Sequence, residues 1–379
     1  MTAAHVIELD LDRSLTQDPR WGHNRWHPDI PPIITVVSGE VVRADLRDGL
    51  DHQITSGSTD RDILDMDMSR GHPLTGPFMV EGARAGDLLE IEILAIEHHG
   101  FGFTCVRPGA GLLAAHVQGP FLAIWDLTDG RATSPQIPGV TVPADPFLGI
   151  VGVAPSLQRM QEYAAREADL ARRGGLVLPP TVESAVPQDA GIAAFGLRTV
   201  PPRENGGNLD AKYLRAGSRL LVQAQVDGGF VSLGDAHYAQ GHGEVCSQAI
   251  EMPATVEFTC RVRPSTGLSW RPSTPVILSA PAPAPAPARR LVTTGIPVDA
   301  GGANHSMDLN VAAVNALLAM QEYLTLERGL SAEQAYALSS VAVDLEILEI
   351  VNRANVLVGA AIDLAIFDDD RRTADMRPR

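Results

Sequence analysis

The chain has 379 residues, which corresponds to two or three domains of about 150 residues or to one large elaborated domain. Its 30 lysines and arginines against 46 aspartates and glutamates give a formal net charge of −16, and the basic residues form no run. A surface that neutralises phosphates is therefore not expected, which argues against nucleic acids and anionic membranes as partners.

The composition is that of an ordinary globular protein, with 45% hydrophobic residues. The chain has no apolar run of the roughly 18 residues that a membrane-spanning helix needs. The first residues lack the apolar core of a secretory signal. The three cysteines, Cys105, Cys246 and Cys260, are too few for a disulfide framework and lack metal-site spacing. We expect a soluble, cytoplasmic protein.

The first 150 residues have the pattern of short strands joined by turns. Two apolar runs, 33–37 and 41–46, flank a Ser-Gly-Glu turn, and a longer run follows at 88–96. Leucine or isoleucine alternates with glutamate in the longer run, which is typical of a half-buried strand. The pattern predicts a β-rich domain over 1–150, resembling a sandwich or a barrel.

The remainder of the chain, 151–379, mixes helical and strand patterns. Two segments have helical periodicity and two later segments have strand-like runs: 157–171 and 307–328, then 345–351 and 356–360. Ser331 begins a further helix with a capping-box pattern. An alanine–proline repeat at 280–288 predicts an exposed loop. We therefore expect a mainly β protein with an α+β part at 151–379, whose boundary is uncertain because the two parts can interleave.

The segment Gly234–Glu244 contains the richest group of polar residues. Asp235 and His237 are two positions apart, so both side chains leave one face of an extended backbone. A carboxylate and an imidazole aimed at one point suit a divalent metal ion, and zinc is a natural candidate. Glycines on both sides of His242 permit a return that brings Glu244 over the site as a proton acceptor. Alternatively, this is a glycine-rich turn whose polar residues only cap strands.

A second polar group precedes it at Glu204–Lys212. Paired glycines allow close approach of a ligand, and Asn208 offers both an amide donor and an acceptor. Asp210 could orient a ligand or hold a metal, and Lys212 is the only lysine of the chain. These three residues are candidates for substrate binding. The alternative is an ordinary Asn-Gly turn.

Two further groups lie nearer the N-terminus. Within residues 21–32, His23 and His27 could reach one metal ion or could instead pack under the neighbouring tryptophan rings. Within residues 72–83, Glu81 stands between apolar and small residues, so it could be buried with a raised pKa and act as a base. Exposure to solvent is the alternative for Glu81.

Taken in order, these groups resemble the acetamidase/formamidase family over about residues 20 to 367. The resemblance rests on residues 23–32, 72–77, 80–83, 205–210, 234–244, 249–251, 333–336 and 343–345. It implies metal-dependent hydrolysis of short amides to a carboxylate and ammonia, a β-sandwich-like part with an α+β part, and a homo-oligomer. The Glu-Asn-Gly-Gly-Asn sequence at 204–208 resembles the formamidase branch. Two departures leave the substrate open: the chain is shorter than typical formamidases, and residues 150–156 lack a cysteine that some relatives carry.

The sequence therefore predicts an amidohydrolase acting on formamide or acetamide. The expected metal ligands are Asp235, His237 and His27. The expected catalytic base is Glu244 or Glu81. The expected substrate-binding residues are Asn208, Asp210 and Lys212. A lactam or cyclic imide hydrolase of the same family is one alternative. A non-catalytic β-sandwich that binds a ligand is another, although few aromatic residues are present for a stacking platform. A cysteine nucleophile is the mechanistic rival.

Overall fold

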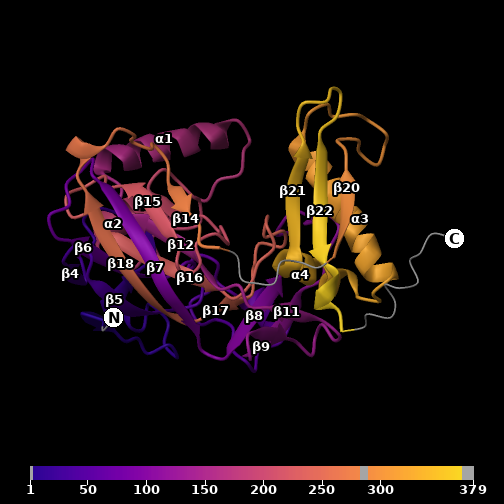
Figure 1. The fold of residues 1–379 in the computed structure, drawn as a ribbon, viewed down its shortest axis with the longest axis horizontal. Helices are drawn as coiled ribbons and strands as arrows, with labels where there is room; N and C mark the ends of the chain where they lie inside the picture. The colour runs from indigo at the N-terminus through magenta and orange to yellow at the C-terminus, as the bar shows by residue number, and fades with distance from the viewer. Residues whose placement is uncertain (1–2, 282–288, 369–379) are drawn as a thin grey trace.

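The structure is a computed structural model and describes residues 3–281 and 289–368. Two large β-sheets pack against each other, and a smaller sheet with two long helices stands at one end of the molecule (Figure 1). The predicted class, mainly β with an α+β part, is confirmed. Most of the alanine–proline repeat, at 282–288, lies outside the described residues.

The first sheet has six strands, and its central strands come from both halves of the chain. In spatial order they are β1 (His5–Ile7), β5 (Val41–Leu46), β18 (Ala254–Arg263), β7 (Leu88–His98), β15 (Arg219–Gln223) and β19 (Val276–Leu278). The alternation predicted for 88–96 is present in β7, where Leu89, Ile91 and Ile93 are buried. Glu90 is buried as well, and the Nε of Arg263 donates to its carboxylate at 2.6 Å.

The second sheet has eleven strands and carries the polar segments. Its main path is β11 (Thr141–Pro143), β10 (Arg131–Thr133), β9 (Phe121–Thr128), β8 (Phe101–Val106), β17 (Glu251–Met252), β16 (Val231–His237), β12 (Phe147–Val153) and β14 (Gly206–Asn208). Off this path, β6 (Leu74–Val80) pairs with β16, β2 (Gly22–His23) and β4 (Ile34–Val36). Every residue of β16 is buried. The Phe78 and Phe258 rings, 5.2 Å apart, join the two sheets.

The two parts expected at 1–150 and 151–379 share sheets in the structure. Residue 150 falls inside β12, and β16 and β18 pair with the earlier strands β6 and β5. Strand periodicity indicates that a segment is a strand and which face is buried, but it does not name the partner strand. The boundary could therefore not be derived from the pattern alone.

Two helices and a small strand pair lie between these elements in the chain. Helix α1 (Leu157–Arg172) begins at Ser156, whose side chain accepts from the N–H of Arg159, and ends just before Gly174. Both ends agree with the predicted helix. Helix α2 (Ala190–Phe195) is short, and β13 (Leu197–Arg198) pairs with β3 (Arg25–Trp26).

The C-terminal unit combines β20 (Arg290–Gly295), β22 (Leu357–Asp363) and β21 (Val343–Glu349) with α3 (Leu309–Leu326) and α4 (Ala332–Ala342). Helix α3 packs so closely on the sheet that a Cβ at Gly295 would lie 2.2 Å from the carbonyl oxygen of Ala312. Helix α4 begins with the predicted capping box of Ser331 and Gln334, contacts β8 and β9, and runs directly into β21 (Figure 1). Among the described helices, none is both long and apolar enough to cross a membrane.

His23 is a structural residue of the second sheet. Its side chain is buried, its Nδ1–H donates to the carbonyl oxygen of Arg25 at 2.6 Å, and its Nε2 accepts from the Ser232 hydroxyl at 2.8 Å. These contacts suit the neutral ring, in which Nδ1 carries the proton and Nε2 accepts. Burial lowers the pKa of His23 to about 4.

This pKa predicts a loss of stability in mild acid. In the unfolded chain the imidazole takes up a proton near pH 6.5, whereas in the folded protein it does so only near pH 4. The His23 contribution is therefore lost as the pH falls from 6.5 to 4, by up to about 3 kcal/mol. Denaturant unfolding at pH 7.5 and 4.5 should show a smaller difference for His23→Gln than for the unchanged protein. Equal differences would contradict this origin.

Candidate active site

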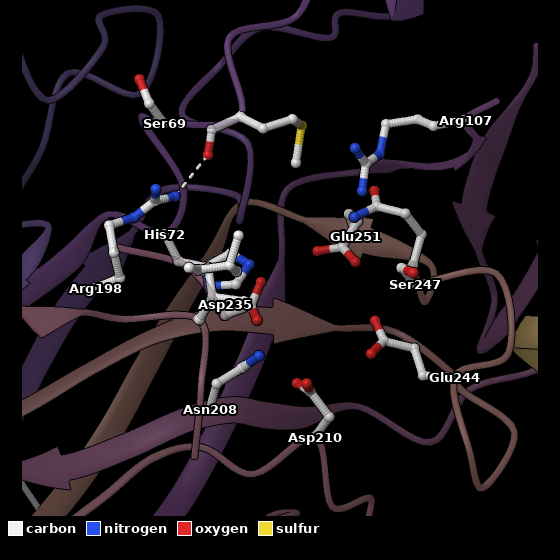
Figure 2. A pocket seen from close by; sticks show the side chains of 14 residues that line it. Ser69, His72, Arg107, Arg198, Asn208, Asp210, Asp235, Glu244, Ser247 and Glu251 are labelled. Atoms are coloured by element: carbon white, nitrogen blue, oxygen red, sulfur yellow. Dashed lines mark hydrogen bonds between the residues drawn. The ribbon is translucent and has the colours of Figure 1, made fainter. Parts of the chain in front are cut away.

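The polar segments meet in one pocket of about 320 Å³ at an end of the second sheet (Figure 2). Its walls come from strands β14, β16 and β17 and from loops of both halves of the chain. The lining residues are Met68, Ser69, His72, Arg107, Leu178, Arg198, Val200, Asn208, Asp210, Asp235, Glu244, Ser247, Gln248 and Glu251. Four carboxylates thus face one cavity, together with two guanidinium groups and an imidazole.

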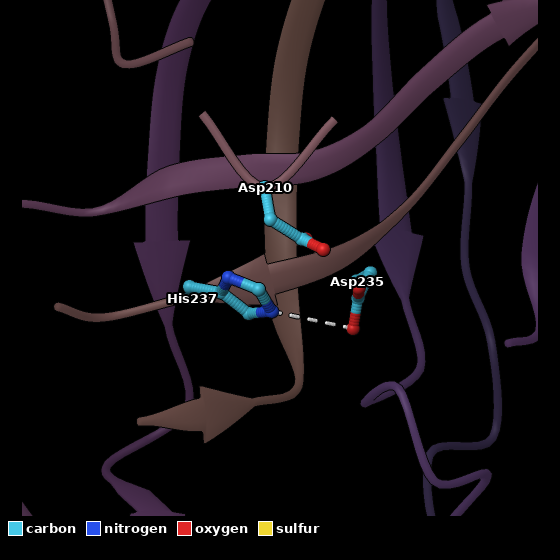
Figure 3. A group of neighbouring side chains, drawn as sticks. All are labelled: Asp210, Asp235 and His237. Atoms are coloured by element: carbon cyan, nitrogen blue, oxygen red, sulfur yellow. Dashed lines mark ion pairs between the residues drawn. The ribbon is translucent and has the colours of Figure 1, made fainter. Parts of the chain in front are cut away.

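Asp235 and His237 meet on strand β16 (Figure 3). His237 Nε2 lies 3.4 Å from Asp235 Oδ1, and both side chains are almost completely buried. Strand β17 pairs with β16 so that Glu251 stands directly opposite His237, and Glu251 Oε2 is also 3.4 Å from His237 Nε2. The imidazole is therefore held between two buried carboxylates.

Asp210 and Glu244 approach this group from two separate loops (Figure 2). Donor atoms of Asp210, Asp235 and His237 lie within 4.8 Å of one another, and so do those of His237, Glu244 and Glu251. His237 belongs to both groups, so all five residues surround one small volume. We call these five residues the acidic cluster.

The backbone is strained at several of these residues. Asp210, Asp235, Glu244 and Ser247 all have positive φ angles, of 44°, 57°, 44° and 69°. Residues with a Cβ adopt this conformation only at a cost in free energy, so surrounding contacts must hold it in place. In return, the strained backbone aims each side chain into the pocket.

Glycines leave the space that the carboxylates occupy. A Cβ on Gly49 would lie 2.2 Å from Asp235 Oδ1 and 3.1 Å from Glu251 Oε2. A Cβ on Gly149 would lie 2.7 Å from Asp210 Oδ1. Any larger residue at these two positions would therefore displace a member of the acidic cluster.

Burial and mutual repulsion shift the pKa values of the acidic cluster. Burial and the nearby charge of Asp235 raise the pKa of Asp210 to about 8, and burial and Asp210 raise that of Glu244 well above its ordinary value. Burial also raises the pKa of Glu251. Burial alone would lower the pKa of His237, but the charges of Glu251 and Asp235 outweigh it and raise that pKa. The cluster therefore has a surplus of buried negative groups, which a cation would relieve.

The donor set fits a divalent metal ion. Zinc binds histidine nitrogen and carboxylate oxygen at about 2.0–2.1 Å, which separates neighbouring ligands of a tetrahedral site by about 3.3 Å. The two distances of 3.4 Å from His237 Nε2 match this separation. Among the described residues, His237 Nε2, Asp235 Oδ1 and Glu251 Oε2 are buried without a hydrogen-bond partner.

Residues 8–369 match the model of the Acetamidase/Formamidase family. The chain belongs to this family. It is 34% identical to a formamidase of Methylophilus methylotrophus, covering 97% of this chain and 94% of the relative. It is 35% identical to an acetamidase of Mycolicibacterium smegmatis, covering 87% and 88%. These matches confirm the predicted amidohydrolase and decide against a non-catalytic binding protein.

Solved structures of similar proteins are known. A gamma lactamase from Delftia acidovorans is 33% identical and has a TM-score of 0.92, with 97% of this chain and 94% of that chain covered. An acetamidase from Bacillus halodurans is 26% identical and has a TM-score of 0.54, with 91% and 95% covered. The fold of this acetamidase/formamidase family member is thus similar to that of the lactamase over nearly its whole length.

Four of the residues predicted from sequence lie in or beside the pocket of this family member, and so does Asn208. The four are Asp210, Asp235, His237 and Glu244, all members of the acidic cluster. Asn208 lines the pocket, and its Oδ1 is buried without a hydrogen-bond partner among the described residues. The spacing argument concerned Asp235 and His237 alone, whereas Asn208 and Asp210 reach the same pocket from β14, which β12 separates from β16 in the sheet.

Three predicted residues are placed elsewhere. Glu81 is exposed and follows the far end of β6, about 20 Å along the strand from the end that pairs beside Asp235. His27 is buried outside the acidic cluster, where its Nδ1 accepts from the N–H of Asp29 at 3.1 Å. Lys212 is outside the pocket lining and forms an ion pair with Asp344. The small residues beside Glu81 and the local spacing of His27 and Lys212 did not predict where these side chains lie. Their positions depend on how distant parts of the chain pack around them.

Other site residues had no role in the sequence-based prediction. Glu251 and His72 lie in segments that carry the family resemblance, which was the available signal. Arg198 lines the pocket while its guanidinium donates to the carbonyl oxygen of Met68 at 2.8 Å (Figure 2). Arg107 also lines the pocket, and its buried Nε has no hydrogen-bond partner among the described residues. No sequence motif marks either arginine.

Proposed function

We propose that this protein is a metal-dependent hydrolase of short aliphatic amides, with zinc as the metal and formamide or acetamide as substrate. The acidic cluster carries the proposal, because five metal-binding or acid–base groups, three of them buried and two half-buried, converge at a pocket lined by Asn208. The similarity to a formamidase and an acetamidase supports the substrate class. The cytoplasmic location and the homo-oligomeric assembly remain predictions from sequence.

Asp235, His237 and Glu251 would hold the ion, because their unpaired donor atoms lie at the separations that a tetrahedral site requires. The bound ion supplies Lewis acidity that polarises the amide carbonyl. The buried position of these residues excludes most competing water and fixes their orientation.

Glu244 would move the protons of the reaction. Its carboxylate accepts a proton from the water whose oxygen attacks the carbonyl carbon, and it returns that proton to the nitrogen as the C–N bond breaks. The remaining proton of that water leaves the new carboxyl group and is taken up by the ammonia, so the products are a carboxylate and an ammonium ion. Asn208 would orient the amide, because its side chain can donate to the carbonyl oxygen and accept from the amide nitrogen. Asp210 lines the same pocket and would help to orient the amide.

The surroundings of the three cysteines argue against a mechanism with a cysteine nucleophile. Cys105, Cys246 and Cys260 are all buried. Burial raises the pKa of Cys246 and of Cys260 to about 12 and that of Cys105 well above its ordinary value. A thiol in this state has almost no thiolate to act as a nucleophile.

Lactam hydrolysis is the second candidate, because the gamma lactamase from Delftia acidovorans is similar over nearly the whole chain. The pocket, at about 320 Å³, also reaches the range that holds ligands larger than formamide. Arg107 could bind the carboxylate that ring opening exposes, since no described residue pairs with its Nε.

A substrate panel tests both candidates. The test uses purified protein whose metal content has been measured. We expect its kcat/KM for release of ammonia from formamide and acetamide to be higher than its kcat/KM for ring opening of 2-pyrrolidinone or succinimide. Ring opening of 2-pyrrolidinone releases no ammonia, so its amino-acid product is measured by mass spectrometry. A tenfold preference for the lactam would favour the second candidate. Full activity after chelation, together with loss on thiol alkylation, would overturn both.

A further inference from the structure

Two loops that carry members of the acidic cluster both contact the side chain of Asp344 in the C-terminal unit. Lys212, two residues after Asp210, forms an ion pair with Asp344 Oδ1. The backbone N–H of His242, two residues before Glu244, donates to the same oxygen at 2.9 Å. One carboxylate oxygen therefore connects the loop of Asp210 with the loop of Glu244.

The second oxygen of Asp344 is held by the small C-terminal sheet. Arg290 on β20 donates from Nη2 to Asp344 Oδ2 at 2.8 Å and from Nη1 to Glu346 Oε1 at 2.6 Å. The side chains of Asp344 and Lys212 are each only 19% exposed, so solvent screens their ion pair weakly. Asp344 thus lies on strand β21 and is held there by a second ion pair, with Arg290.

Other contacts between the C-terminal unit and the Glu244 loop point the same way. The N–H of Gly241 donates to the carbonyl oxygen of Ser340 at 2.8 Å, and that of Leu345 donates to His242 at 2.8 Å. The Ser340 hydroxyl donates to the carbonyl oxygen of Gln248 at 2.6 Å. The loop is therefore attached to α4 and β21 on both sides of Glu244.

We propose that Asp344 is a positioning residue for amide hydrolysis, setting the placement of Asp210 relative to Glu244 without contacting the substrate. Both residues have strained backbones, with φ of 44° each, which need contacts from outside their own loops. Gln240 Nε2 also donates to the carbonyl oxygen of Asp210 at 2.8 Å, so the loops are joined to each other. This inference rests on the proposed function, and it gives Lys212 a role outside the pocket.

Two substitutions test the proposal against a matched control. Asp344→Asn keeps the shape of the side chain but removes its charge, and Lys212→Met removes the partner. We expect each to lower kcat at least tenfold, with KM and metal content changed less than threefold. Glu346→Gln is the control, because Glu346 lies on the same strand and its carboxylate pairs with the same Arg290, while among the described residues no hydrogen bond or ion pair joins its side chain to either loop. Its kcat should stay within twofold.

Rescue and coupling distinguish positioning from a general loss of stability. Lys212→Arg should restore most of kcat, and the double variant of Lys212→Met with Asp344→Asn should be no worse than either single variant. A kcat for Asp344→Asn within twofold of the unchanged protein, at lowered thermal stability, would overturn the proposal. Additive losses in the double variant would also contradict it.

Hydrogen exchange provides a readout that does not depend on turnover. Backbone amides of 209–215 and 238–248 should exchange faster in Asp344→Asn than in Glu346→Gln. If the unchanged protein hydrolyses no amide, the proposed function fails, and the exchange pattern still tests whether Asp344 holds both loops. Equal exchange in both variants would contradict that role.

Discussion

Replacing Glu244 by glutamine is expected to lower kcat for formamide or acetamide by about 10²- to 10⁴-fold while the protein keeps its metal. Glutamine has almost the same shape as glutamate, but it cannot accept the proton of the attacking water. Glu244 lines the same pocket as Asp235 and lies on a loop that is hydrogen-bonded to the C-terminal unit. Steady-state kinetics and metal analysis of the same preparation measure both expected results.

Glu81→Gln provides the comparison for Glu244. Glu81 is exposed and separated from the pocket by the length of β6, so its replacement should change kcat less than twofold. If Glu244→Gln loses the metal, Glu244 is a ligand and another residue must carry the proton. If Glu81→Gln loses the activity instead, the assignment of the base is wrong.

Replacing His237 by glutamine is expected to release the metal and to lower kcat/KM by more than about 100-fold, beyond the 10–100-fold effect of residues that only support metal ligands. His237 Nε2 lies 3.4 Å from oxygen atoms of both Asp235 and Glu251 and belongs to both groups of donor atoms. Its loss also leaves two buried carboxylates without their positive neighbour, so a lower thermal stability should accompany the loss of metal.

His27→Gln is the matched control for this experiment, because the same substitution is made at a buried histidine outside the acidic cluster. The His27→Gln protein should contain as much metal per molecule as the unchanged protein. Metal content after dialysis, measured by atomic absorption on folded protein, decides between the two positions. Retention of metal by His237→Gln, or its loss from His27→Gln, would contradict the ligand assignment.

Local patterns in the sequence determined the elements and part of the site. Alternation over 88–96 predicted strand β7, and the capping box at Ser331 predicted the start of α4. The two-residue spacing of Asp235 and His237 predicted their meeting at one point. Each of these predictions depends on neighbours within a few positions and on regular strand or helix geometry, from which Asp235 itself departs with a φ of 57°.

Tertiary structure alone decided the remaining members of the site. Glu251 enters the acidic cluster because β17 pairs with β16 in a register that sets it opposite His237. Glu81 lies outside the site because it follows the distant end of β6. Lys212 forms an ion pair with Asp344, 132 positions away in the chain. Periodicity indicates which face of a strand is buried, but the partner strand and its register depend on the packing of the whole chain.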